Sequence, residues 1–172
     1  MRRVAELLDE WSVAAGLNPV ERRRRVALGY LHDALKGAAP DALRELLDPP
    51  LRDLPGPVLH GPAAAELLAR EGVDDLSFLR AVRYHTLGHP DFDEAGRALY
   101  AADFLDPGRD LRNRWRAELR ERMPAEGPTV VRDILHARIK HLLNRNRPVR
   151  LETIAFWNSL TKGPSWARAS EV

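Results

Sequence analysis

The sequence Leu-His-Asp-Ala-Leu-Lys, residues 31–36, places a histidine directly before an aspartate, His32-Asp33. An imidazole nitrogen and a carboxylate oxygen can both bind a metal ion, and a carboxylate has two oxygens with which to bridge two ions. Three further candidate ligands follow: His60, His85 and Asp103. Such ligands suit divalent iron, manganese or zinc, and sites with open coordination positions are catalytic. The residues therefore predict a metal-dependent hydrolase.

The composition indicates one globular domain. The chain has 172 residues, of which 44% are hydrophobic, so it can form a substantial core. It has no cysteine, so a metal site must use histidine, aspartate or glutamate. The formal net charge is only +2, which gives little support to nucleic acid as a partner.

Nothing in the sequence indicates membrane insertion or secretion. There is no run of about 18 apolar residues. Glu6 and Asp9 come too early for the apolar region of a signal peptide. We therefore expect a cytoplasmic protein with no membrane partner, and the sequence is compatible with a homodimer.

The spacing of apolar residues predicts helices nearly throughout and no sustained β-alternation. Gly16 ends a first helix, and Asn18-Pro19 begins a second that continues to Lys36, where Gly37 closes it. Prolines 49, 50, 55 and 57 predict a loop. Further helices are expected over 41–47, 61–70, 74–86, 93–104, 111–122, 129–144 and 151–160. The fold class is all-α: a single compact helical bundle over residues 1–162, with a mobile C-terminal tail over 163–172.

The candidate ligands must be weighed against ordinary structural roles. A single histidine on a helix is more often a cap or core residue than a ligand, and a His-Asp dipeptide often occurs by chance. The wide spacing of the candidates does not by itself establish that they converge. Gly29, one turn before Asp33, would let another helix approach closely. His89 is expected in a loop, and His136 and His141 in surface or core packing.

The run of four arginines at residues 22–25 raises the alternative of RNA binding. Consecutive residues point to all sides of a helix, so these arginines do not form one face. With the low net charge and the neighbouring Glu21, a solvated start of a helix is the favoured interpretation.

The order of these residues resembles the YqeK branch of the HD-domain metallophosphohydrolases, over nearly the whole chain. The resemblance rests on His32-Asp33, His60-Gly61, Tyr84-His85-Thr86 and Ala102-Asp103, on Pro107 and Arg109, and on the segment from Arg147-Pro148-Val149 to Trp157-Asn158. It implies an all-helical HD domain that hydrolyses diadenosine tetraphosphate symmetrically to two ADP. It also implies a centre of two divalent metal ions, typically iron, with manganese or another ion as the alternative.

Carried over by position, the resemblance implies one metal ion held by His32, Asp33 and Asp103. It implies a second held by His60 and His85, with Asp33 bridging the two. A hydroxide between the metals would then attack a central phosphorus. Lys36 is expected to act with Asp33 in catalysis and to bind a phosphate oxygen. Thr86 and Arg109 are the other expected substrate-binding residues.

The chain departs from the HD pattern at one position. HD domains usually carry another histidine shortly before Val-Ala on the first helix, and counting back from Val4-Ala5 puts it just before Met1. We expect either a first helix truncated at the N-terminus or a natively lost ligand. Two alternatives therefore stay open: another HD-type nucleotide phosphohydrolase, and a non-catalytic nucleotide-binding HD protein with a degenerate metal site.

Overall fold

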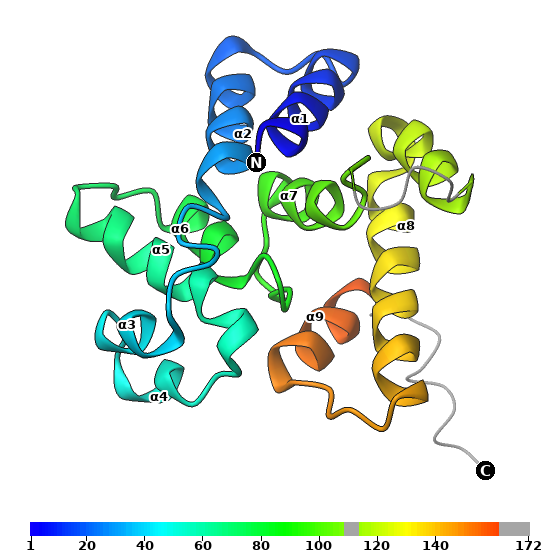
Figure 1. The fold of residues 1–172 in the computed structure, drawn as a ribbon. Helices are drawn as coiled ribbons and strands as arrows, with labels where there is room; N and C mark the ends of the chain where they lie inside the picture. Colours follow the sequence, from blue (N-terminus) through cyan, green and yellow to red (C-terminus); the bar gives the residue numbers. More distant parts are fainter. Residues whose placement is uncertain (109–113, 162–172) are drawn as a thin grey trace, which may run out of the picture.

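The computed structural model describes residues 1–108 and 114–161 (Figure 1). Across these residues it is helical, with no β-strand, which confirms the predicted all-α class. The expected tail, 163–172, lies outside the described residues. The elements are α1 (Arg2–Ala14), α2 (Pro19–Leu31), α3 (Pro40–Glu45), α4 (Pro49–Arg52), a 3₁₀ turn η1 (Gly56–Val58), α5 (His60–Arg70), α6 (Leu76–Tyr84), α7 (Glu94–Phe104), α8 (Arg114–Asn144) and α9 (Leu151–Thr161).

Helices α1 and α2 form an antiparallel pair, and the turn between them lies where the sequence predicts it. Gly16 has φ +66°, a backbone conformation that favours glycine. The Asn18 side chain then accepts hydrogen bonds from two backbone amides of the next turn, with Pro19 in first position. Gly29 lies against Ala5, where an added Cβ would be 2.5 Å from the Ala5 Cα. The absence of a side chain at Gly29 therefore sets the separation of the two helices.

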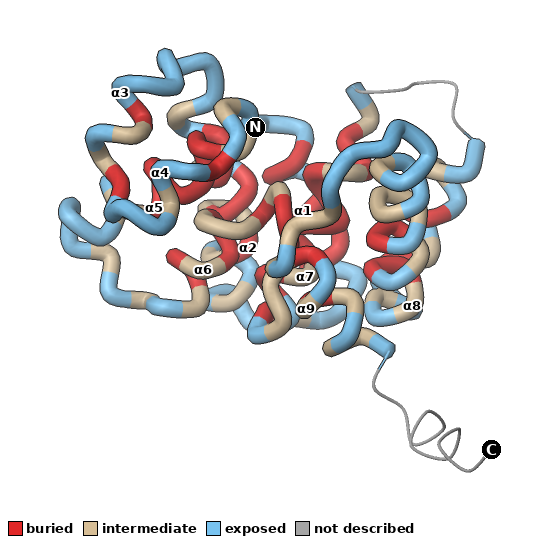
Figure 2. The backbone as a smooth tube through the Cα atoms, turned by 90° about the horizontal axis from the view of Figure 1, so that it is seen from below, coloured by how far each residue is buried: buried red, intermediate tan, exposed pale blue. Residues whose placement is uncertain are grey.

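The core forms around α7, which lies between the α1–α2 pair, α6 and α8 (Figure 1). Every residue of α7 from Ala98 to Asp103 is buried. Figure 2 shows buried backbone gathered in the interior and exposed backbone along the outer turns. A second, smaller cluster joins the α3–α4 region to the start of α5, through Leu43, Leu47, Leu54, Leu59, Ala63 and Leu87.

The structure corrects several helix boundaries. α2 ends at Leu31 and not at Lys36, and residues 32–37 form turns. The expected loop at the double proline contains a short helix, α4, because Pro49 occupies a first-turn position that needs no amide donor. The two helices predicted over 111–122 and 129–144 are the arms of α8, which is non-helical at Glu126.

The arginine run is less solvated than expected. Arg22 and Arg23 are exposed, but Arg24 is half-buried and Arg25 is buried. Arg24 donates to Asp75 (2.6 Å) and lies 3.1 Å from Asp93, so it connects α2 to the starts of α6 and α7. Within the described part of the chain, no helix is both long and apolar enough to span a membrane.

Candidate metal centre

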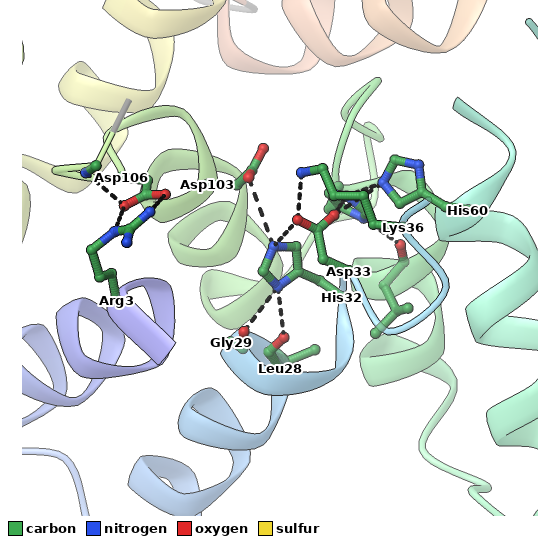
Figure 3. A network of polar contacts seen from close by, with 12 residues as sticks. Arg3, Leu28, Gly29, His32, Asp33, Lys36, His60, Asp103 and Asp106 are labelled. Atoms are coloured by element: carbon green, nitrogen blue, oxygen red, sulfur yellow. Dashed lines mark hydrogen bonds and ion pairs between the residues drawn. The ribbon is translucent and has the colours of Figure 1, made fainter. Parts of the chain in front are cut away.

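All five predicted ligands are buried, and they come from the ends of helices. Figure 3 shows four of them, His32, Asp33, His60 and Asp103, gathered around one point. His32 is the C-cap of α2, and Asp33 follows in the turn. His60 is the first residue of α5, His85 is the C-cap of α6, and Asp103 lies in the last turn of α7. The fold therefore brings together residues that are far apart in the sequence.

The carboxylate of Asp33 lies at the middle of this group. Its Oδ1 is 3.1 Å from Nε2 of His60 and 3.5 Å from Nε2 of His85. Its Oδ2 is 3.4 Å from Nε2 of His32 and accepts a 2.6 Å hydrogen bond from Nζ of Lys36. Three imidazoles thus present the same ring nitrogen to one carboxylate, with His32 facing one oxygen and the other two histidines facing the other.

The backbone at the end of α2 fixes the orientation of His32. Its Nδ1 lies 3.0 Å from the carbonyl oxygen of Gly29 and 3.3 Å from that of Leu28, so this nitrogen donates its hydrogen. The Nε2 atom then points toward Asp33 and lies 3.7 Å from Oδ1 of Asp103 (Figure 3). Such a hydrogen bond on the far ring nitrogen is typical of metal-binding histidines.

His85 is oriented in the same way, and His60 meets it from α5. Nδ1 of His85 lies 2.8 Å from the carbonyl oxygen of Val82, and its Nε2 is 3.1 Å from Nε2 of His60. The approach of α5 to α6 depends on Gly61, where an added Cβ would be 3.0 Å from the Val82 carbonyl oxygen and 3.1 Å from the His85 ring.

The electrostatics of the centre favour a cation. Burial alone would raise the pKa of Asp33, but the three imidazoles and Lys36 outweigh it and hold the pKa well below its usual range. Burial likewise opposes the charged form of His32, yet the carboxylates of Asp103 and Asp33 raise its pKa to about 9. Burial lowers the pKa of His85, which favours its neutral imidazole.

The residues fit a divalent metal ion. His32, Asp33 and His85 each offer a ligand atom, and these atoms all lie within 4.8 Å of one another. Among the described residues, buried Nε2 of His32 and Oδ1 of Asp33 form no hydrogen bond. A buried polar atom without a partner is costly, and a metal ion would remove that cost. His60 and Asp103 lie beside this cluster, in position to complete it.

The structure describes two of the three expected substrate-binding residues, Lys36 and Thr86. Lys36 contacts Asp33, while 54% of its side chain is exposed, so it lies at the edge of the centre. The Thr86 hydroxyl is buried without a hydrogen-bond partner in the described chain. The backbone carbonyl oxygen of Thr86 accepts a hydrogen bond from Arg138. Arg109 lies outside the described residues.

Sequence reasoning missed Arg3 and Asp106. Arg3 donates to Asp106 at 2.7 Å and 3.2 Å, which joins α1 to the turn after α7 (Figure 3). Both residues line a cavity of about 320 Å³ beside the centre, together with Met1, Val4, Asp33, Ala34, Lys36 and Asp103. No sequence signal connects two residues this far apart.

The remaining histidines contact other parts of the molecule. His89 lies in a loop, as predicted, with its ring 4.7 Å from the ring of Tyr84. His136 and His141 are exposed on α8, and the ring of His136 lies 6.0 Å from that of Trp157.

Comparison with known proteins agrees with this geometry. Residues 1–108 match the HD domain family. Curated relatives named symmetrical bis(5'-nucleosyl)-tetraphosphatase come from Halalkalibacterium halodurans (27% identical over 60% of this chain and 54% of the relative) and from Bacillus subtilis (29% identical over 70% of this chain and 64% of the relative). The chain thus spans between half and two thirds of the length of these relatives.

A solved structure shares the fold. It is described as a predicted HD superfamily hydrolase involved in NAD metabolism from Clostridium acetobutylicum, with a TM-score of 0.77 and 23% identity. The alignment covers 92% of this chain and 85% of that one. From the family match, the buried His-Asp cluster and this common fold, the chain is identified as a member of the HD domain family.

Proposed function

We propose that the protein is a metal-dependent phosphoanhydride hydrolase that cleaves diadenosine tetraphosphate symmetrically to two ADP. The observation that carries the proposal is the convergence of three imidazole Nε2 atoms on the two oxygens of Asp33. The substrate class is supported by the relatives named symmetrical bis(5'-nucleosyl)-tetraphosphatase.

Two divalent metal ions are proposed for this centre, with iron as the first candidate. One set of ligands would be His32, Asp33 and Asp103, and the other His60, His85 and Asp33. Asp33 serves both sets because Oδ2 faces His32 while Oδ1 faces His60 and His85. When bound, such ions lower the pKa of water and neutralise charge on phosphate oxygens.

The protein's own groups would bind and orient the polyphosphate. Water adds to one of the two central phosphorus atoms, the central anhydride bond breaks, and each half leaves as ADP. Lys36 holds an ammonium group beside Asp33 at the exposed edge of the centre, where a phosphate oxygen can reach it. Thr86, next to His85 in the chain, is proposed as a further phosphate contact through its buried hydroxyl, which has no hydrogen-bond partner among the described residues. Arg109 is proposed as a bidentate phosphate ligand.

Product analysis tests this proposal. The protein would be loaded with ferrous iron without oxygen, or with manganese in parallel, and incubated with diadenosine tetraphosphate. Anion-exchange chromatography should show ADP as the sole product. ATP with AMP would contradict symmetrical cleavage, because these products require an outer anhydride bond to break instead of the central one.

A panel of other nucleotides separates this activity from the alternatives. Nucleoside monophosphates, nucleoside triphosphates, cyclic nucleotides and NAD would be compared at equal concentration. Preferential turnover of one of these would replace the tetraphosphatase proposal with another HD-type phosphohydrolase. Nucleotide binding without turnover by the metal-loaded protein would indicate a binding-only role.

A further inference from the structure

A second cavity, of about 210 Å³, lies where α1, α2, α7 and α8 meet. Trp11 lines it, whereas Arg3 lines the cavity at the metal centre. At 1.5 Å per residue along α1, these two residues are about 12 Å apart. We call the second cavity the arginine pocket; its lining residues include Trp11, Arg25, Glu94, Arg97, Met123 and Pro128.

Arg25 is a buried cation with incomplete pairing. The residue is only 8% exposed, and its buried Nε has no hydrogen-bond partner among the described residues. Its Nη2 reaches Oε2 of Glu94 at 3.5 Å, but 88% of the Glu94 side chain is exposed. Burial lowers the pKa of Arg25, although Glu94 and other carboxylates oppose that effect. A weak contact with a solvated carboxylate leaves most of the cost of burying the guanidinium unmatched.

Arg97 adds a second guanidinium to the same pocket. It lies on α7, one turn after Glu94, and is half-buried. Its Nε is buried and unpartnered, and the structure gives it no ion pair within residues 1–108 and 114–161. Guanidinium groups form strong, planar, paired hydrogen bonds with carboxylates and phosphates.

The rest of the pocket is apolar and shaped by the kink in α8. Met123, Pro124, Ala125, Gly127 and Pro128 flank the non-helical Glu126, and they face Trp11 and Ala15 of the α1 end. Apolar walls with a few convergent polar groups are the usual lining of a small-molecule site.

We propose that the arginine pocket binds a small organic anion. Its carboxylate or phosphate group contacts Arg25 and Arg97, and its apolar body packs against Trp11 and the prolines of α8. The binding site is separate from the metal centre, and the proposal does not depend on the activity proposed there.

Calorimetric titration of the full chain tests the pocket with three probes of similar size: benzoate, phenyl phosphate and neutral benzamide. At least one anion should bind, and benzamide should not. The stronger anion identifies the preferred head group. Because a phosphate or carboxylate can also bind metal ions, the titrations would be repeated with Asp33→Asn, which should leave binding to the arginine pocket unchanged.

The decisive variant is Arg97→Gln, which removes a charge that forms no ion pair with any other described residue. It should weaken anion binding by about tenfold or more, the usual effect of losing a charge-assisted hydrogen bond. Arg23→Gln is the matched control, since Arg23 is an exposed arginine of α2 outside this pocket, and it should bind as the parent does. Circular dichroism would verify the fold of each variant.

The proposal would be overturned by benzamide binding as well as the anions, by Arg97→Gln retaining full affinity, or by neither anion binding. Loss of binding in Asp33→Asn would also refute it, since the anion would then occupy the metal centre.

Discussion

Replacing Gly29 with alanine should destabilise the protein, although alanine is the better helix former. The new Cβ would lie 2.5 Å from Cα, 2.7 Å from N and 2.9 Å from Cβ of Ala5. The first two of these atoms are backbone, so no side-chain rotation relieves the contact and α1 must move away from α2. Overpacking costs about 1–3 kcal/mol, and a clash with backbone belongs at the upper end of that range. The higher helix propensity of alanine over glycine offsets about 1 kcal/mol of this cost.

The expected net loss is therefore about 2 kcal/mol, equivalent to a fall in Tm of about 4–8 °C for a domain of this size. Thermal and urea unfolding would measure it. Gly127→Ala is the matched control, because the nearest atom to its added Cβ is the flexible end of Met123 at 3.6 Å. This control should be neutral or slightly stabilising.

The same substitution should also weaken metal binding. The carbonyl oxygen of Gly29 lies 3.0 Å from Nδ1 of His32, so a shift of this turn disturbs the orientation of that imidazole. Metal affinity, measured by competition with a chromogenic chelator, should fall with Gly29→Ala and stay constant with Gly127→Ala. A Gly29→Ala protein as stable as its parent would refute the helix-packing argument.

Three further predictions concern charged side chains. Asp33→Asn should abolish metal binding and turnover together, as measured by metal content and ADP release. The control is Asp106→Asn, which alters another buried carboxylate lining the same cavity and should retain the metal. An Asp33→Asn protein that still binds its full complement of metal would contradict the proposed ligand set. Lys36→Gln should lower kcat/KM by about tenfold or more at unchanged metal content, since a charge-assisted phosphate contact is lost. Hydrogen bonding from Arg24 lowers the pKa of Asp75, so the charged Asp75 carboxylate stabilises the fold above about pH 4, and this stabilisation is lost as the pH falls. Asp75→Asn should therefore lower the free energy of unfolding at neutral pH but change it little in acid. An equal loss at both pH values would contradict this.

Much of the fold follows from local sequence signals. Helical spacing, Gly16 and the Asn18-Pro19 start predict correctly where α1 ends and α2 begins. The predicted end of α2, at Lys36, is wrong. At the observed end, the His32 ring contacts the carbonyl oxygens of Leu28 and Gly29, which a continuing helix would pair with backbone amides alone. The spacing of apolar residues does not predict such a contact.

The sequence predicts the candidate ligands as a set of residues and carries no information on their geometry. The meeting of His60 and His85 depends on Gly61 packing against the end of α6, which is a tertiary contact. The burial of Arg25 likewise arises from tertiary packing around α2, so a rule based on composition places that arginine in solvent.

The candidate ligands come from four separate segments, and this spacing ties the supply of metal to folding. The two proposed ions share Asp33 as a ligand, and through His60, His85 and Asp103 they would act as reversible cross-links that close three successive loops of the chain. Helices α3 to α6 lie inside those loops, while α8 and α9 follow the last ligand. Removing the metal would therefore promote local unfolding in the first half of the chain more than in the second. Amide hydrogen exchange in α5 and α6 would become faster when the metal is removed and slower when it is restored.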